Sequence, residues 1–318
     1  NYRTTGLNND GTFDTTFDSD GKQTINIQSD DRCTCIALQP DGKIVLGGFS
    51  YPTMSNTSWF AAVRLTSDGQ PDASFSGDGK AVAKIGFGND TVYDMALQPD
   101  GKILLAADSY IPNSQDIGVV RFTTAGELDT TFSGDGKFNT TFNNTTDYVN
   151  AIAVQPDGKI LVGGSFYDAS SRKMGLLRLT ADGILDTSFS TDGKADYVVP
   201  GGNGVSVYDM KLQSTGQILM SGYAQNDFML ARILSGNELG VAQFDSDAAG
   251  FYPNPARNEI SFKELTNATS IFNANGQKVL DIAAGSISAD VSALQTGIYM
   301  FETVDASGNI GHRKLIKE

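Results

Sequence analysis

The ten residues Gln155-Pro-Asp-Gly-Lys-Ile-Leu-Val-Gly-Gly164 carry the clearest structural signal in this chain of 318 residues. They open with a turn, because Pro156 fixes φ at the first corner, Asp157 can bond back to the backbone and Gly158 accepts the left-handed conformation. The apolar residues after the turn are predicted to run back as the second strand of a hairpin. The Gly163-Gly164 pair indicates a bulge or a close approach of two backbones.

This hairpin segment recurs along the chain, and two other markers recur in phase with it. It returns as Gln39–Ile44 and Gln98–Ile103, and in degraded form as Gln213–Ile218. The second marker, Asp-x-x-Phe-x-x-Asp-Gly-Lys, begins at Asp14, Asp72, Asp129 and Asp186, in steps of 58, 57 and 57 residues. The third is an arginine followed by an apolar residue, at Arg64, Arg121, Arg178 and Arg232. Three markers in one phase indicate an internal repeat of about 57 residues.

Each repeat is predicted to contain four short antiparallel strands. In the third repeat these are residues 148–155, 159–166, 174–180 and 184–189. One phenylalanine recurs at a fixed place and is expected to anchor the core of each repeat; these residues are Phe17, Phe75, Phe132 and Phe189. A unit of this size cannot bury both faces of its sheet alone, so the repeats must stack. Radial stacking in a β-propeller is favoured, and a linear β-solenoid is the alternative.

These repeats resemble a known family. The Gln-Pro-Asp-Gly-Lys-Ile-Leu-Val-Gly-Gly run, the Arg-Leu-x-x-x-Gly turn and the Asp-x-x-Phe segment are similar to delta-60 repeats, which belong to bacterial surface proteins and are expected to form propeller-like domains. The resemblance covers residues 1–244. The chain opens with strands three and four of a preceding unit, and residues 237–244 are a degraded copy of part of that pair. Either this half-unit closes a ring against the last repeat, or the chain is the C-terminal part of a longer array, which is the interpretation we favour.

The repeat pattern stops at a polar stretch, residues 245–251, which is predicted to be a linker. Beyond it, the two prolines of Tyr252-Pro-Asn-Pro-Ala256 predict an extended segment that is not a central strand. Strands are then predicted at residues 259–262, 269–273, 277–282, 297–304 and 312–316, with Asn275-Gly276 as a hairpin turn. This pattern fits a small antiparallel, Ig-like β-sandwich. The predicted fold class is therefore all-β, a propeller-like array of four-stranded repeats followed by this sandwich.

Residues 252–318 resemble the C-terminal sorting domain of type IX secretion cargo. Three motifs carry the resemblance; they contain Tyr252, Pro253, Asn254 and Pro255, then Gly297, Ile298 and Tyr299, then Arg313, Lys314 and Lys317. The resemblance implies export across the outer membrane of a Gram-negative bacterium to the cell surface. It also implies that an outer-membrane shuttle barrel and the translocon bind the tail, that a sortase removes it, and that the cargo is joined to surface lipopolysaccharide. From the residues alone, the basic terminus is expected to pair with carboxylates of a partner, or else to be solvated at the end of a capping domain.

The composition argues against several classes of function. A net charge of −14 and a pI near 4.4 disfavour nucleic acids and bare anionic membranes as partners. The single histidine, His312, lies in the tail, so no nucleophile–histidine–acid triad is expected in the repeats. Cys33 and Cys35 are too few for a disulfide framework and are predicted to be two small buried residues. The repeats are therefore expected to be non-enzymatic.

Two sets of residues are candidates for ligand binding. Asp94 and Asp209 take the same place in the first strand of their repeats, which is innermost in a propeller, so they are predicted to line a channel. They are also the candidate residues of an alternative function, a polysaccharide-active enzyme. Trp59, Tyr51 and Tyr110 lie between strands two and three, where the repeats differ most, which favours adhesion or binding of a glycan or protein. A third function class is a structural subunit of a secretion or surface assembly.

One turn has the composition of a calcium loop. Asp18 and Asp20 place two carboxylates two residues apart, directly before a glycine. The late bidentate glutamate is missing, and the second and third repeats keep only one carboxylate at this place. A structural turn is therefore favoured, and calcium is the alternative as a cofactor.

Overall fold

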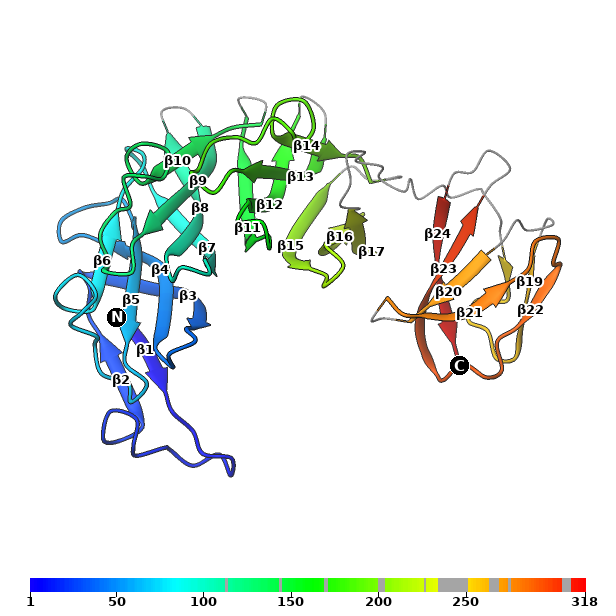
Figure 1. The fold of residues 1–318 in the computed structure, drawn as a ribbon, viewed down its shortest axis with the longest axis horizontal. Coiled ribbons are helices and arrows are strands. Elements are labelled where there is room, and N and C mark those ends of the chain that lie inside the picture. Colours follow the sequence, from blue (N-terminus) through cyan, green and yellow to red (C-terminus); the bar gives the residue numbers. More distant parts are fainter. Residues whose placement is uncertain are drawn as a thin grey trace. The chain divides into compact units, whose positions relative to one another are not determined.

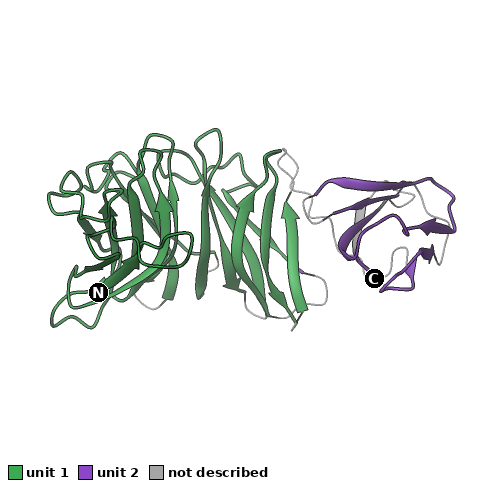
Figure 2. Ribbon diagram, turned by 90° about the horizontal axis from the view of Figure 1, so that it is seen from below, with its two compact units in different colours: residues 1–198, 202–239 green, residues 199–201, 240–318 purple. Residues whose placement is uncertain are grey.

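The computed structural model describes residues 1–111, 114–142, 145–168, 171–199, 204–225, 227–233, 251–262, 269–273, 276–304 and 310–318. Every regular element in these ranges is a β-strand, which confirms the all-β class; no described helix has the length and apolarity needed to cross a membrane. The chain forms two compact units, one of residues 1–198 and 202–239 and one of residues 199–201 and 240–318 (Figure 2). The predicted linker, except for Phe251, and the degraded copy at residues 237–244 lie outside the described residues.

The first unit consists of antiparallel sheets that follow one another along the chain. A two-stranded sheet of β1 (Tyr2–Thr5) and β2 (Lys22–Ile25) comes first. Sheet 1 contains β3 (Asp30–Leu38), β4 (Ile44–Tyr51), β5 (Trp59–Leu65) and β6 (Lys80–Ala83). Sheet 2 contains β7 (Asp90–Leu97), β8 (Ile103–Ile111), β9 (Ser114–Phe122) and β10 (Lys137–Thr140). Sheet 3 contains β11 (Asp147–Val154), β12 (Ile160–Tyr167), β13 (Arg172–Leu179) and β14 (Lys194–Tyr197). Sheet 4 contains β15 (Val205–Leu212), β16 (Ile218–Ala224) and β17 (Asp227–Ile233), and the sheets stand side by side along an arc (Figure 1).

The Gln-Pro-Asp-Gly-Lys segments form the hairpin turns that the sequence predicts. Gly158, at the turn between β11 and β12, has a φ of 85°. The bulge lies on the strand opposite the glycine pair, at Asn150. The backbones approach so closely at Gly164 that a Cβ there would lie 1.8 Å from the carbonyl oxygen of Tyr148. A glycine is therefore required at this position.

The prediction of the fourth strand is wrong. Residues 184–189 form turns, in which the amide of Phe189 donates to the carbonyl of Asp186 at 2.8 Å and only Leu185 makes an isolated bridge, with Leu179. Positive φ values at Ser190 (56°) and Gly193 (86°) then turn the chain back toward β13. The four residues of β14 complete the sheet, a strand too short to produce a visible alternation of apolar and polar residues.

The recurring phenylalanine joins each repeat to the next one. Phe75 is fully buried, and its ring lies against Gly126 in the turn after β9, where a Cβ would come within 3.0 Å of the ring. The amide of Ser76 donates to the carbonyl of Ala125 in the same turn at 2.6 Å. The same arrangement links Phe17 to Gly69 and Phe132 to Gly183. The predicted role of these residues as core anchors is confirmed, and it extends across the boundary between repeats.

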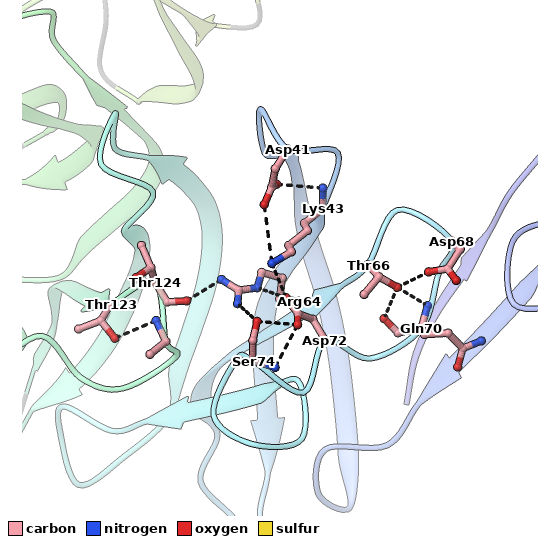
Figure 3. Close-up of polar contacts among 11 residues, drawn as sticks. Asp41, Lys43, Arg64, Thr66, Asp68, Gln70, Asp72, Ser74, Thr123 and Thr124 are labelled. Atoms are coloured by element: carbon pink, nitrogen blue, oxygen red, sulfur yellow. Dashed lines mark hydrogen bonds and ion pairs between the residues drawn. The ribbon is translucent and has the colours of Figure 1, made fainter.

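The recurring arginine is the centre of a polar network (Figure 3). Nε of Arg64 donates to Oδ2 of Asp72 at 2.7 Å, and Nζ of Lys43 lies 3.1 Å from the same oxygen. The remaining nitrogens of Arg64 donate to the hydroxyl of Ser74 and to the carbonyl of Thr124, which belongs to the turn after β9. The network therefore ties β4 and β5 of sheet 1 to sheet 2. Equivalent ion pairs join Arg121 to Asp129 and Arg178 to Asp186.

The second unit consists of two antiparallel sheets. The first contains β18 (Phe251–Tyr252), β19 (Glu259–Phe262) and β22 (Ser288–Asp290). The second has the order β21 (Lys278–Ile282), β20 (Thr269–Phe272), β23 (Gly297–Val304) and β24 (Ile310–Lys317). Ile260, Ile271, Phe301 and Leu315 are buried in its core. All five predicted strands are present, whereas the short strands β18 and β22 were not predicted. Gly276, with a φ of 75°, forms the predicted turn, and Asn275 lies outside the described residues.

Candidate functional site

The three tail motifs, which are far apart in the sequence, meet around the last strand, β24. β24 is an edge strand whose inner side pairs with β23. Ile298 lies directly opposite Ile316, and Tyr299 lies opposite Leu315. The hydroxyl of Tyr299 donates to the carbonyl of Gln295 at 2.8 Å, which fixes the ring against the core.

The Tyr-Pro-Asn-Pro-Ala segment lies along the outer side of β24. The side-chain amide of Asn254 donates to the carbonyl of Lys314 at 2.8 Å and accepts from the amide of Ile316 at 2.8 Å. The amide of Ala256 donates to the carbonyl of Ile316 at 2.8 Å, and the amide of Glu318 donates to the carbonyl of Ala256 at 2.9 Å. β24 is therefore held on both sides over its last residues, by β23 and by residues 254–256.

The expectation of a free basic terminus needs a correction. Lys317 is only 7% exposed, and its ammonium donates to the backbone carbonyl of Glu318, because it lies on the same face of β24 as the buried Leu315. Lys314 lies on the opposite face and is exposed. The backbone of Arg313 pairs with Phe301, while its side chain is outside the described part of the chain. Ile298 and Tyr252 are 60% and 57% exposed, so the accessible surface around β24 combines these apolar side chains with the cation of Lys314.

Asp94 and Asp209 occupy equivalent positions, directly after the bulges of β7 and β15. Oδ2 of Asp94 accepts the amide of Ile152 at 2.9 Å, so this carboxylate joins sheet 2 to sheet 3. Burial raises the pKa of Asp94, and the nearby charge of Asp209 raises it further. Oδ1 of Asp209 accepts from the amide of Met210 and pairs with Lys211 at 3.0 Å. Both carboxylates therefore have structural partners.

The candidate aromatic residues lie at the ends of strands and not in the loops between them. Tyr51 is the last residue of β4, Trp59 is the first residue of β5, and Tyr110 is in β8. The indole of Trp59 is half-buried, with Nζ of Lys84 5.9 Å from its centroid. Tyr51 and Tyr110 share their strand position with Tyr167 of β12, which the sequence reasoning missed although a tyrosine recurs seven residues after the isoleucine of the first three hairpins.

A second set of residues missed in the sequence is the buried aspartates at the start of the first strands of sheets 1, 2 and 3. Asp31, Asp90 and Asp147 each stand thirteen residues before the hairpin isoleucine, a periodic signal that was available. Their carboxylates accept the amides of Ile27 and Gln28, of Ile85 and of Phe142 from the preceding loops. Burial raises the pKa of Asp147 to about 6.

Another buried carboxylate, that of Asp108 in sheet 2, contacts sheet 3. Oδ1 of Asp108 accepts the amide of Val149 at 2.6 Å, and Oδ2 accepts the side-chain amide of Gln115 at 2.6 Å. Burial raises the pKa of Asp108 to about 7. These contacts explain Asp108 as a structural residue at the junction of the two sheets.

The remaining candidates have local explanations. Oδ1 of Asp20 accepts the amide of Lys22 at 2.9 Å, and Asp18 accepts the side-chain amide of Gln70. Among the described residues no three histidine, cysteine or carboxylate side chains converge as a metal site, and calcium at Asp18 and Asp20 stays a prediction. The expectation of two buried cysteines is wrong: Cys35 is half-buried, and Cys33 is exposed because a bulge at Thr34 separates it from Cys35.

Comparison with protein families agrees with both halves of this description. A domain described as "Secretion system C-terminal sorting domain" matches residues 250–318. A β-propeller domain of unknown function, DUF5122, matches residues 39–75, 98–132 and 155–189. The chain is an array of β-propeller repeats with a C-terminal sorting domain. A WD domain, G-beta repeat, also matches this repeat array, at residues 136–170. The sorting domain marks the repeat array for export through the type IX secretion system to the cell surface, and for contact with that machinery.

Several solved structures are similar to the repeat array and its sorting domain. One is PorZ, a surface component of the type IX secretion system of Porphyromonas gingivalis, with 12% identity and a TM-score of 0.37 over 99% of this chain and 44% of that chain. Another is virginiamycin B lyase from Staphylococcus aureus, with 14% identity and a TM-score of 0.39 over 87% and 82%. A third is a gluconolactonase from Xanthomonas campestris, with 15% identity and a TM-score of 0.36 over 72% and 67%. The chain thus spans less than half the length of PorZ. A comparison with curated proteins finds no significant match.

Proposed function

We propose that the repeat array is a non-enzymatic binding protein of the cell surface, and that the exposed surface around β24 is the part of the tail that the export machinery contacts. The observation that carries the second statement is the meeting of all three tail motifs at β24. The proposed contacts are an outer-membrane shuttle barrel and the translocon, followed by a sortase that removes the tail and joins the cargo to lipopolysaccharide.

Charge and polarity at the exposed surface test this assignment. Ile298→Asp combined with Lys314→Glu, made in the full chain, should leave the protein in the periplasm, because both side chains are exposed and neither is needed for the core. Ile287→Asp is the matched control, since Ile287 is 70% exposed elsewhere on the tail. Protease accessibility on native cells measures export. Equal export of the double variant and the control would overturn the proposed contact surface.

The proposed binding role of the repeat array rests on the recurring tyrosines. Tyr51, Tyr110 and Tyr167 take one position in three successive repeats, and the last two are 50% and 41% exposed. Exposed aromatic rings with neighbouring polar groups suit a glycan or a protein surface. In affinity electrophoresis through a panel of neutral polysaccharides, Tyr110→Ala with Tyr167→Ala should abolish any retardation of the native chain. Tyr208→Ala, at an exposed tyrosine of another strand position, should not.

A polysaccharide-active enzyme is the second candidate function. It is favoured by the pKa of Asp94, which burial and the nearby charge of Asp209 raise, because two neighbouring carboxyls in different environments are the pattern of an acid and base pair. Release of reducing ends from a surface polysaccharide that is lost in both Asp94→Asn and Asp209→Asn would establish it. The third candidate, a structural subunit, predicts that residues 252–318 remain in the intact mass of protein recovered from the cell surface, whereas a removed tail excludes it.

A further inference from the structure

Asn254 replaces strand backbone at the outer side of β24. Its side-chain amide both donates and accepts, to Lys314 and from Ile316, at 2.8 Å in each case. A carboxamide offers one carbonyl and one N–H donor group, as a peptide unit does. Pro253 and Pro255 have no backbone N–H to offer, so this side chain supplies the donor that the segment otherwise lacks there.

The two bonds of Asn254 restrain the last residues of β24. A terminal edge strand frays unless it is tied down. With β23 on one side, residues 314–318 gain backbone contacts on the other side from Asn254 and Ala256, and Arg257 pairs with the side chain of Glu318 at 3.2 Å. Asn254 is itself exposed, so its bonds do not serve to satisfy a buried polar group.

The bonds from Asn254 and Ala256 to β24, called the strap below, also affect the position of the exposed surface. Lys314 and Ile316 alternate with the buried Leu315, and Ile316 lies directly opposite Ile298. If the outer side of β24 loosens, residues 314–318 keep their pairing with β23 but lose a second restraint, so Lys314 and Ile298 are held less rigidly relative to each other. The order in space of these side chains thus depends on a residue about sixty positions away.

We propose that Asn254 is a positioning residue of the sorting signal: it locks β24 so that the export machinery recognises a folded surface and not a linear peptide. The inference rests on the proposed contact surface around β24. In this proposal the Pro-Asn-Pro motif holds the conformation of β24, and Ile298 and Lys314 contact the machinery directly.

The test separates position from direct contact by replacing the bonds with a covalent link. Asn254→Leu in the full chain, with Cys33→Ser and Cys35→Ser, should lower surface export by about tenfold, since both bonds are lost. Ala256→Cys with Lys317→Cys should restore export of this variant, because residues 256 and 317 are bridge partners and the periplasm is oxidising. A shift on a non-reducing gel verifies the disulfide. Full export of Asn254→Leu, or no rescue by a verified disulfide that the Asn254 chain tolerates, would overturn the proposal.

Hydrogen exchange on the purified full chain gives a second, independent test of whether Asn254 restrains β24. The amide of Ile316 should exchange about tenfold faster in Asn254→Leu, while the amide of Phe301 in the neighbouring strand should not change. An unchanged Ile316 amide would refute the strap whatever the result in cells. The two proposals also fail separately: normal export of the Ile298 and Lys314 variant with impaired export of Asn254→Leu would reject the contact surface and leave the strap in place.

Discussion

Replacing Arg64 by methionine tests how strongly the polar network joins two repeats. The change removes the bonds to Asp72, Ser74 and the carbonyl of Thr124, and leaves Asp72, which is 6% exposed, with Lys43 as its remaining cation. Breaking a buried ion pair by removing one partner costs about 3–5 kcal/mol. Because Lys43 still pairs with Asp72, we expect the lower end, about 3 kcal/mol. This corresponds to a fall in melting temperature of about 6–12 °C for a unit of this size.

Urea denaturation followed by circular dichroism measures the free energy of unfolding of the Arg64 variant. The matched control is Arg3→Met, at an exposed arginine of β1, which should change stability by less than about 0.5 kcal/mol. Adding Asp72→Asn to Arg64→Met should recover part of the loss, because no buried charge is then left with an incomplete set of partners. A loss below about 1 kcal/mol for Arg64→Met, or a further loss in the double variant, would refute the reasoning.

Three other perturbations have defined outcomes. Gly164→Ala should lower the urea midpoint strongly, because the new Cβ would lie 1.8 Å from a carbonyl oxygen; an unchanged midpoint would contradict the close approach. Burial raises the pKa of Asp108 to about 7, so the folded chain holds a proton that the unfolded chain releases near pH 4, and stability should fall as pH rises from about 4 to about 7. Asp108→Asn should flatten this slope in melting curves, and an equal slope would exclude Asp108 as its source. Burial alone would raise the pKa of Asp129, but the hydroxyl of Thr131 and the cations of Lys102 and Arg121 lower it to about 2, so the stability it adds should be lost as pH falls from about 4 to about 2. Asp129→Asn should remove this acid-side loss, whereas an unchanged acid limb would count against the ion pair.

The architecture was predictable from sequence because its signals are local and repeated. A Pro-Asp-Gly turn and a periodic phenylalanine place the first hairpin and the core anchor without any knowledge of distant contacts. The fourth strand was misplaced because residues 184–189 contain apolar residues that pack from turns, while β14 is only four residues long.

The tail site could be recognised from its motifs, but its chemistry could not. Nothing in the sequence around Asn254 indicates that its partners are Lys314 and Ile316, because such a contact depends on the order of strands in space. The charge of Lys317 led to the expectation that its side chain is accessible. Its burial follows instead from the face of β24 on which it lies, which the sequence does not show. At the end of a strand such as β24, the neighbouring residues alone do not show whether a side chain is buried or exposed.

The contact between each phenylalanine and the following turn has a consequence for how such chains change length. Every interior repeat brings the ring that fits its successor and the glycine turn that receives the ring of its predecessor. Recombination that removes or duplicates one whole period leaves matching halves at the new boundary, so the altered gene still encodes a continuous stack. Crossovers out of phase would put a ring against a strand instead. Changes in the length of this array that keep the stack continuous are therefore expected to add or remove whole repeats.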